Sequence, residues 1–389
     1  MIARIRSYLS YKEALDEWSR LKIDPPTLSS EEIEDFIFTY LEAECETEDL
    51  SNLSELIGGA GGDIRMSTKS GRGRYLVFGD ASFYKNLTKY RDNPTVGIML
   101  DALKNYRSLS TEPIKLSNQS LKFDKTLVMG ILNVTPDSFF DGGAYFSRES
   151  AIKRVFQMVD EGADIIDIGG ESTRPFSTPI PETVERERVI PILEEVIPSI
   201  DIPISIDTRK PSIAREAVEI GAEIVNDVSG LRDREMMRTV SELDVPVIIM
   251  HMLGDPQTMQ LNIAYEDVVG DILMFLARQI REAEENGISR DKIIIDPGIG
   301  FGKEVHHNLD ILRRLREFRS LGRPLLVGAS RKTFIGKVLD LPKEERLEGS
   351  LASAAVSVIN GADIVRVHDV KETVRVCRLI DAIYGTRKD

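Results

Sequence analysis

Polar side chains gather directly after apolar runs in two neighbouring stretches of this chain. The first stretch, Leu127–Gly143, reads LVMGILNVTPDSFFDGG, and the second, Gly162–Pro175, reads GADIIDIGGESTRP. Asn133, Glu171 and Arg174 all stand just past the apolar part. An apolar run that ends in small, hydroxyl and charged residues is typical of a buried strand that leads into a polar loop. The pattern therefore predicts chemistry at the ends of strands.

The same combination recurs along the rest of the chain. Later apolar runs end in Asp207-Thr208-Arg209-Lys210, Asn226-Asp227, Met250-His251-Met252, Asp296, Ser330-Arg331-Lys332 and Arg366-Val367-His368-Asp369. One such residue is usually a cap or a turn former, but a polar group after every run favours a functional site. Basic residues are frequent among them, which predicts an anionic substrate. The basic residues are Arg174, Arg209, Lys210, Lys303, Arg331, Lys332, Arg366 and His368.

Eight strand-length apolar runs alternate with longer amphipathic stretches from Lys125 onward. The runs are Thr126–Val134, Asp164–Gly169, Ile204–Asp207, Glu223–Val228, Val245–Met250, Lys292–Asp296, Pro324–Gly328 and Asp363–Val367. The stretches with helical spacing lie near 148–161, 183–199, 211–220, 232–243, 265–287, 307–319, 348–360 and 370–384. This alternation predicts an α/β fold, a closed (β/α)8 TIM barrel whose strand ends meet at one face. A doubly wound open sheet is the alternative.

The first part of the chain follows a different pattern. Residues 1–120 are predicted to form a smaller mixed α/β domain, and residues 121–389 the barrel domain. Helical spacing occurs in Tyr11–Leu21 and in Ser30–Glu44. Tyr75–Phe78 is predicted to be a strand, and Ala81–Arg107 two helices that divide at Asn93-Pro94.

Two further stretches of this part are interpreted as connections. The glycine-rich Gly58–Gly62 lacks the Lys-Ser/Thr continuation and the clean preceding strand of a phosphate-binding loop, so it is predicted to be an ordinary loop. The polar stretch Leu109–Asp124 is predicted to be a linker between the domains. We find no candidate for chemistry before the barrel.

Composition and charge narrow the class of protein. The 389 residues are 42% hydrophobic and 29% charged, which is typical of a soluble globular protein. With only Cys45 and Cys377, a disulfide framework and a cysteine zinc site are excluded, and a cytoplasmic location is expected. No apolar run approaches the length of a membrane span. The net charge of −14 argues against a non-specific nucleic-acid-binding protein.

The ordered motifs NVTPDSF, GGESTRP, IDT, ND, DPGIGFGK, SRK and RVHD resemble the dihydropteroate synthases, a pterin-binding family. The resemblance extends from about Leu127 to the C-terminus, and the preceding residues look like an N-terminal extension without an implied role. It implies a folate-biosynthesis transferase that joins 6-hydroxymethyl-7,8-dihydropterin diphosphate to 4-aminobenzoate and releases diphosphate. It also implies a homodimer that associates through barrel helices.

The resemblance implies a pterin pocket and a set of catalytic groups. The implied pterin-binding residues are Asp207, Asn226, Met250, Asp296 and Lys332. A carboxylate can accept two hydrogen bonds from the amide and amine of one pterin edge, and an amide side chain can bind the remaining groups. The implied catalytic residues are Lys332, Asp207, Arg366 and His368.

The diphosphate and its metal ion are implied to bind on another side of the site. The implied diphosphate-binding residues are Asn133, Thr173, Arg174, Arg366 and His368. Arg366 could hold phosphate bidentately, which a lysine could not. Asn133 is the implied ligand of Mg²⁺, a hard cation that is usually bound by few protein oxygens together with substrate phosphates.

The arylamine is implied to bind beside Thr173, Pro175, Phe301 and Thr333. The start of the helix after Lys332 offers backbone N–H groups to its carboxylate. The glycines of Gly298–Lys303 are interpreted as a tight turn, because Glu304 stands where a phosphate-binding loop needs Ser or Thr. The loops 134–147 and 171–183 are expected to be mobile until substrate binds.

Two positions depart from the family pattern, and both lie on the arylamine side. Phe176 stands where the family usually has glycine, and Thr333 stands where it commonly has serine. One alternative is therefore the same pterin transfer to a different arylamine, as in a methanopterin-type pathway. A second is a pterin-dependent methyltransferase, which does not need the SRK lysine or the RVHD motif. A third is a non-catalytic pterin-binding module.

Overall fold

The computed structural model of the chain describes residues 2–6, 11–21, 23, 37–43, 48–66, 73–108, 111–135 and 148–385. The chain divides into two compact units. Unit 1 comprises Met1–Leu109 with Arg316–Gly322, and unit 2 comprises Ser110–Leu315 with Arg323–Asp389. The division therefore lies at Leu109 instead of near residue 120.

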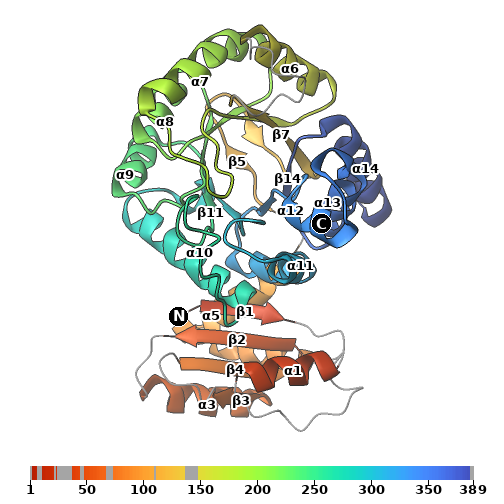
Figure 1. Ribbon diagram of the computed structural model, residues 1–389. Helices are drawn as coiled ribbons and strands as arrows, with labels where there is room; N and C mark the ends of the chain where they lie inside the picture. Colours follow the sequence, from red (N-terminus) through yellow and green to blue (C-terminus); the bar gives the residue numbers. More distant parts are fainter. Residues whose placement is uncertain are drawn as a thin grey trace. The chain divides into compact units, whose positions relative to one another are not determined.

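Unit 2 is a parallel barrel whose strands lie inside a ring of helices (Figure 1). The strands are β7 (Leu127–Asn133), β8 (Ile165–Gly169), β9 (Ile204–Asp207), β10 (Ile224–Asp227), β11 (Val247–Met250), β12 (Ile293–Asp296), β13 (Leu326–Val327) and β14 (Ile364–Val367). They hydrogen-bond in the order β12-β11-β10-β9-β8-β7-β14-β13, and a parallel bridge between Ile295 and Leu325 joins the two ends. The predicted TIM barrel is confirmed, and the open sheet is excluded.

Helices form the outer ring of the barrel, and a helix lies in each of the eight stretches predicted from helical spacing. The predicted stretches contain α6 (Arg148–Asp160), α7 (Glu182–Val196) with η2 (Ile197–Ser199), α8 (Pro211–Ile220), α9 (Arg234–Leu243), α10 (Val268–Glu285), α11 (Val305–Arg313), α13 (Leu347–Ile359) and α14 (Val370–Tyr384). The short elements η3 (Arg290–Lys292), α12 (Thr333–Leu339) and η5 (Lys343–Glu345) lie outside these stretches, and η4 (Leu315–Leu321) belongs almost entirely to unit 1. Because helices and barrel interior cover both faces of the strands, the strands are buried almost throughout and are continuous apolar runs in the sequence. None of the described helices is long and apolar enough to cross a membrane.

A short hairpin closes the amino-terminal end of the barrel. It consists of β5 (Ile114–Lys115) and β6 (Ser120–Leu121), which pair antiparallel. Four buried residues of this segment pack against the first inward-facing residues of the strands, such as Leu127 and Ile224. These four are Ile114, Leu116, Leu121 and Phe123. The predicted linker Leu109–Asp124 is therefore wrong, because its few apolar residues are part of the barrel core.

Unit 1 is a four-stranded antiparallel sheet with helices on both faces. Its strands, in sheet order, are β1 (Ile2–Arg6), β2 (Ile37–Ala43), β4 (Gly73–Gly79) and β3 (Asp63–Met66). Alternate residues of β4 enter different cores, Tyr75 and Val77 one and Leu76 and Phe78 the other, as the period of a strand requires. The first core includes α3 (Glu48–Ala60), α4 (Ala81–Leu87) and α5 (Pro94–Arg107), with η1 (Thr88–Tyr90) between the last two, and the second includes α1 (Tyr11–Leu21).

The predictions for unit 1 are partly wrong. The helix Tyr11–Leu21, the strand at Tyr75–Phe78 and the two helices of Ala81–Arg107 are confirmed. The predicted helix Ser30–Glu44 is wrong for residues 37–43, which form β2, while residues 30–36 and 44 lie outside the described residues. The predicted loop at Gly58–Gly62 is wrong for its first residues, because α3 continues to Ala60.

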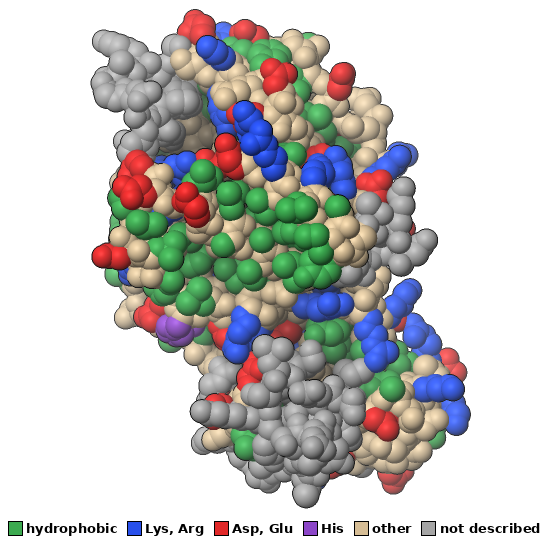
Figure 2. Space-filling model, turned by 90° about the vertical axis from the view of Figure 1, so that its right-hand side faces the viewer, with side chains coloured by type: hydrophobic (Ala, Val, Ile, Leu, Met, Phe, Trp, Pro, Cys, Tyr) green, Lys and Arg blue, Asp and Glu red, His purple; other side chains and the backbone are tan. Residues whose placement is uncertain are grey.

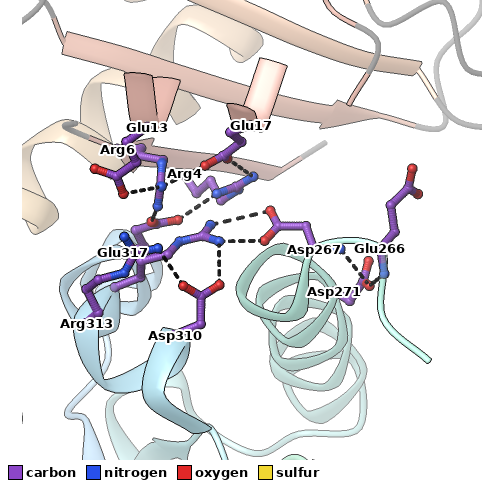
Figure 3. Close-up of polar contacts among 11 residues, drawn as sticks. Arg4, Arg6, Glu13, Glu17, Glu266, Asp267, Asp271, Asp310, Arg313 and Glu317 are labelled. Atoms are coloured by element: carbon purple, nitrogen blue, oxygen red, sulfur yellow. Dashed lines mark hydrogen bonds and ion pairs between the residues drawn. The ribbon is translucent and has the colours of Figure 1, made fainter. Parts of the chain in front are cut away.

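Buried charges connect two distant parts of the sequence within unit 1. Figure 3 shows Arg4 and Arg6 pointing toward Glu317, and each arginine donates a hydrogen bond to that carboxylate. Arg6 also forms ion pairs with Glu13 and Glu17. Because a buried arginine that loses its partner is strongly destabilising, Glu317 is an integral part of unit 1.

Candidate active site

The strand ends of the barrel bring four polar side chains into one hydrogen-bonded network. Arg366 of β14 donates from Nε to Asp167 of β8 at 2.6 Å and from Nη2 to Asp207 of β9 at 2.7 Å. Asn226 of β10 donates from Nδ2 to Asp167 at 3.0 Å. Asn226 therefore keeps its carbonyl oxygen as a hydrogen-bond acceptor for a ligand.

Asp167 was not predicted as a site residue. It is fully buried, and its Oδ2 accepts both hydrogen bonds, while Oδ1 has no partner among the described residues. A buried carboxylate oxygen without a donor is unfavourable, so a donor from substrate or water would be stabilised there. The sequence contains a signal that could have identified Asp167, because this residue is the one carboxylate within the otherwise apolar strand IIDIG.

Burial and pairing determine the charges in this network. Burial raises the pKa of Asp207 to about 7, although the guanidinium of Arg366 acts in the opposite direction. For Arg366, burial lowers the pKa, but the carboxylates of Asp167 and Asp207 outweigh burial and the pKa is raised. Arg366 therefore stays charged, and Asp207 can exchange a proton near neutral pH.

A second group of residues lies at the ends of β12 and β13. Asp296 accepts a hydrogen bond from the Gly298 backbone at 2.7 Å, and burial raises its pKa to about 6. The amine of Lys332 lies 4.0 Å from the centre of the Phe301 ring. Burial lowers the pKa of Lys332 to about 8, and the positive charge of Arg366 contributes. Perturbed carboxylates and amines in one cleft are typical of a catalytic site.

The segment Gly298–Lys303 is a tight turn, as predicted. Gly298 has φ of 68°, and a Cβ atom there would lie 2.0 Å from the His251 carbonyl oxygen. The buried amine of Lys303 secures the turn by contacting Nδ1 of His251 at 3.0 Å and donating to the Phe301 carbonyl at 2.9 Å. Burial lowers the pKa of Lys303 well below its usual value. Lys303 therefore serves to position Phe301 instead of binding an anion.

The predicted basic rim is wrong for several of its residues. Arg209 and Lys210 both form ion pairs with Glu171, and Arg331 forms two hydrogen bonds with Asp369. Lys210 also pairs with Glu185, so three carboxylates neutralise these three cations. The sequence could not reveal this, because the partners lie on different elements.

Two further predicted residues, Met250 and His368, also lie at the strand ends of the barrel. Met250 is buried and packs with Val228, Met252, Met259 and the partly buried Phe301. His368 approaches the hydroxyl of Ser330 at 3.1 Å, and burial lowers its pKa to about 3, so it is neutral.

Residues predicted for diphosphate and arylamine are the more accessible ones. Asn133 and Thr173 are half-buried, while Arg174, Pro175 and Thr333 are exposed. The loop 171–183 is described in one conformation, and residues 136–147 of the other predicted mobile loop lie outside the described residues. The structure thus brings the pterin-side residues together, whereas the ligand roles of all these residues stay predictions.

Comparison with known proteins connects this barrel to one enzyme class. Residues 129–368 match the family model "Pterin binding enzyme". The dihydropteroate synthase of Escherichia coli strain K12 is 44% identical over 270 residues, which are 69% of this chain and 96% of that protein. The Bacillus subtilis enzyme of the same name is 46% identical over 276 residues, which are 71% of this chain and 93% of that protein.

Solved structures give the same result. The Yersinia pestis dihydropteroate synthase with a sulfonamide drug complex has a TM-score of 0.68 and 39% identity, and the match covers 70% of this chain and 99% of that one. The Xanthomonas albilineans enzyme with 4-aminobenzoic acid has a TM-score of 0.67 and 40% identity, covering 71% and 99%. The same enzyme in complex with 7,8-dihydropteroate has a TM-score of 0.65 and 38% identity, covering 70% and 99%.

Proposed function

Because this chain belongs to the pterin-binding enzymes and, within them, to the dihydropteroate synthases, we propose that it joins 6-hydroxymethyl-7,8-dihydropterin diphosphate to 4-aminobenzoate. In this reaction the bond between the methylene carbon and the diphosphate oxygen breaks, and a bond to the arylamine nitrogen forms. The nitrogen loses a proton, and diphosphate leaves with the electron pair. The observation that carries the proposal is the group at the strand ends of this barrel, in which Asp207, Asn226 and Asp296 are buried and Lys332 and Arg366 are half-buried beside them.

The pterin would bind in the part of the site that is already organised. Asp296 would accept hydrogen bonds from the amide and amine on one edge of the ring, because its carboxylate is buried and ionised above its pKa of about 6. The carbonyl oxygen of Asn226 would accept another, since its amide nitrogen is held by Asp167. Met250 would pack against the ring face. Lys332 would place a positive charge beside the methylene carbon and its leaving group.

The leaving diphosphate would bind where cations remain available. Arg174 is exposed, and its charge contributes to the lowered pKa of Lys332, so both cations act on the same region. Arg366 already donates from Nε and Nη2 to carboxylates, so it could bind phosphate through these atoms only by exchanging partners. Thr173 and neutral His368 would add hydrogen bonds. Catalysis then consists mainly of electrostatic stabilisation and positioning.

We also propose Mg²⁺ as the metal ion and Asn133 as its protein ligand. Asn133 is the last residue of β7, and its half-buried amide oxygen is the hard type of ligand that Mg²⁺ prefers. When bound, the ion would neutralise charge on the diphosphate. We expect calorimetry to show that Mg²⁺ strengthens binding of the pterin diphosphate and that Asn133→Ala removes this effect. An unchanged Mg²⁺ dependence in the variant would exclude Asn133 as the ligand.

An apolar surface on unit 2 supports the proposed homodimer. Figure 2 shows hydrophobic side chains gathered on the face formed by α12, α13 and α14. The exposed residues are Val338, Leu339, Val356, Ile359, Leu379, Ile383 and Tyr384. A continuous exposed apolar patch is typical of an association surface, and a second copy of the chain is the occupant that the family resemblance implies.

Sedimentation can test the dimer. We expect the double variant Leu379→Asp, Ile383→Asp to sediment as a monomer at concentrations where the unmodified chain is a dimer. Leu261→Asp is the matched control, because Leu261 is also exposed but lies outside the patch. A dimer that survives the double variant would place the interface elsewhere.

A cytoplasmic location is a further proposal. The sequence contains only two cysteines, Cys45 and Cys377, which are too few for a disulfide framework that would need an oxidising compartment. Cell fractionation with a tagged full-length chain would test it.

An assay with the pterin diphosphate, Mg²⁺ and a panel of arylamines tests the function. We expect dihydropteroate and diphosphate to form in equal amounts with 4-aminobenzoate. Efficient turnover with another arylamine alone would favour a methanopterin-type reaction. Methyl transfer to a corrinoid without release of diphosphate would instead indicate a methyltransferase, and binding without turnover a non-catalytic module.

A further inference from the structure

Phe176 combines two unfavourable features at the mouth of the barrel. Its φ of 65° lies in the left-handed region, which a bulky side chain disfavours. Its side chain is also 64% exposed. Leu231 shares the conformation but is buried, so packing can compensate for its strain. Among the described residues, Phe176 is the aromatic residue with a positive φ, which makes this position a candidate for function.

Hydrogen bonds hold the backbone of Phe176 across the mouth. Its N–H donates to the carbonyl of Pro256 at 2.8 Å. Phe176 lies in the loop after β8, and Pro256 lies in the loop after β11, so β9 and β10 stand between the two loops in the sheet. The next residue, Ser177, donates to the carbonyls of Arg174 and Ser172. The strained conformation is therefore fixed by its surroundings.

The loop after β11, which accepts the hydrogen bond from Phe176, also contacts the predicted arylamine pocket. Met259, three residues after Pro256, packs in the cluster that includes Phe301. Gln260 donates to the carbonyl of Gly300 at 3.2 Å. The Phe301 ring in turn lies over the amine of Lys332. The backbone of Phe176 is thus anchored to the segment that packs against Phe301, and its side chain is exposed.

We propose that Phe176 is a specificity-determining residue whose ring packs against the arylamine substrate at the mouth of the site. This inference rests on the proposed function and adds one contact to it. An exposed aromatic ring gains free energy when it packs against another aromatic ring and both lose contact with water. The retained backbone strain is then the cost of presenting a ring at a position where glycine would adopt the same φ without strain.

Three variants separate the ring from the backbone. Phe176→Gly removes the ring and the strain, Phe176→Ala removes the ring but keeps the strain, and Phe176→Leu keeps apolar bulk. We expect the Gly and Ala variants to raise the KM for 4-aminobenzoate about fivefold to tenfold. The KM for the pterin diphosphate should change less than about twofold, because the organised pterin residues are untouched. The Leu variant should recover most of the loss.

Measurements of Tm and a matched control variant show whether a change in KM comes from the Phe176 ring. The Tm should be highest for the Gly variant and lower for the Ala variant, because only glycine relieves the positive φ. Phe156→Ala is the control, since Phe156 is an exposed phenylalanine on α6. It should leave both KM values unchanged.

Two outcomes would overturn the inference. One is a KM for 4-aminobenzoate that stays within twofold of the unmodified chain in both the Gly and Ala variants. The other is a parallel rise of both KM values, which would indicate a general loss of the mouth's structure. Failure of the proposed function is distinguishable, because the unmodified chain would then form no dihydropteroate at all.

Discussion

The floor and the margin of the active site differ in how far their side chains are buried and bonded within the barrel. The floor consists of Asp167, Asp207, Asn226, Asp296, Lys332 and Arg366, which are buried or half-buried and make most of their contacts within the barrel. The margin, defined by Thr173–Phe176 and Thr333, is half-buried or exposed. A pre-organised floor stabilises charge without reorganisation, whereas an exposed margin gains contacts when the substrate covers it.

This difference separates two kinds of mutational effect. Substitutions in the floor should lower turnover, because they alter the positions of charges around the reacting carbon. Substitutions in the margin should mainly raise the KM for the arylamine, because they remove contacts made on binding. The predictions below test this separation, beginning with the largest effect.

The largest effect is expected for Asp296→Ala and for Lys332→Ala. Each removes a charged group of the floor whose charge no other residue can supply at that place, so kcat/KM should fall at least about 1000-fold. Circular dichroism should show an intact barrel. Exposed Asp291→Ala and Lys337→Ala are the matched controls. Normal turnover in either site variant would contradict the assignment of the floor.

Asp167→Asn should affect stability and activity together. The change leaves Arg366 with Asp207 as its remaining hydrogen-bonded carboxylate, so we expect a loss of about 2–3 kcal/mol in the free energy of unfolding. The kcat/KM should fall at least about tenfold, because the orientation of Arg366 and Asn226 is lost. Urea unfolding and steady-state kinetics measure the two effects, with Asp160→Asn on α6 as control. A stable and fully active variant would show that Asp167 is not needed.

The floor should also produce a bell-shaped pH profile of kcat/KM. The pKa values of Asp296, about 6, and Asp207, about 7, mean that acid protonates these carboxyls and removes their acceptor function. The pKa of Lys332, about 8, means that its positive charge is lost above that pH. Activity should therefore be greatest near pH 7–8 and decline on both sides. In Lys332→Arg, any remaining activity should persist at higher pH, because arginine keeps its charge. If the decline of kcat/KM at high pH were unchanged in this variant, the decline would have to come from another group.

Lys303→Met is the smallest expected effect and tests the connection between floor and margin. It removes the amine that contacts His251 and Phe301 but keeps the apolar stem. We expect the KM for the arylamine to rise about threefold to tenfold, with little change in the KM for the pterin, because Phe301 loses its fixed position. Equal changes in both KM values would show that the turn supports the whole site.

The barrel was predictable because its strands are buried on both faces. The sequence runs that form β7 to β14 are continuous and apolar, and the amphipathic stretches between them form the surrounding helices. The secondary structure of unit 1 was harder to predict, because its segments are short and their hydrophobic patterns fit both a helix and a strand. The segment IFTYLEA of β2 carries apolar residues compatible with either period, and its partners β1 and β4 lie far away in the sequence.

The sequence by itself determined the order of the motifs, the strand ends that carry them and the residue types that can bind a pterin, because these depend on local patterns. Only the tertiary structure decided which of these charges are available. The neutralisation of Arg209, Lys210 and Arg331, the network around Asp167 and the strained backbone of Phe176 all arise from contacts between different loops and strands. Pairing and burial, which set the charge of each group, are properties of three-dimensional neighbours and not of neighbours along the chain.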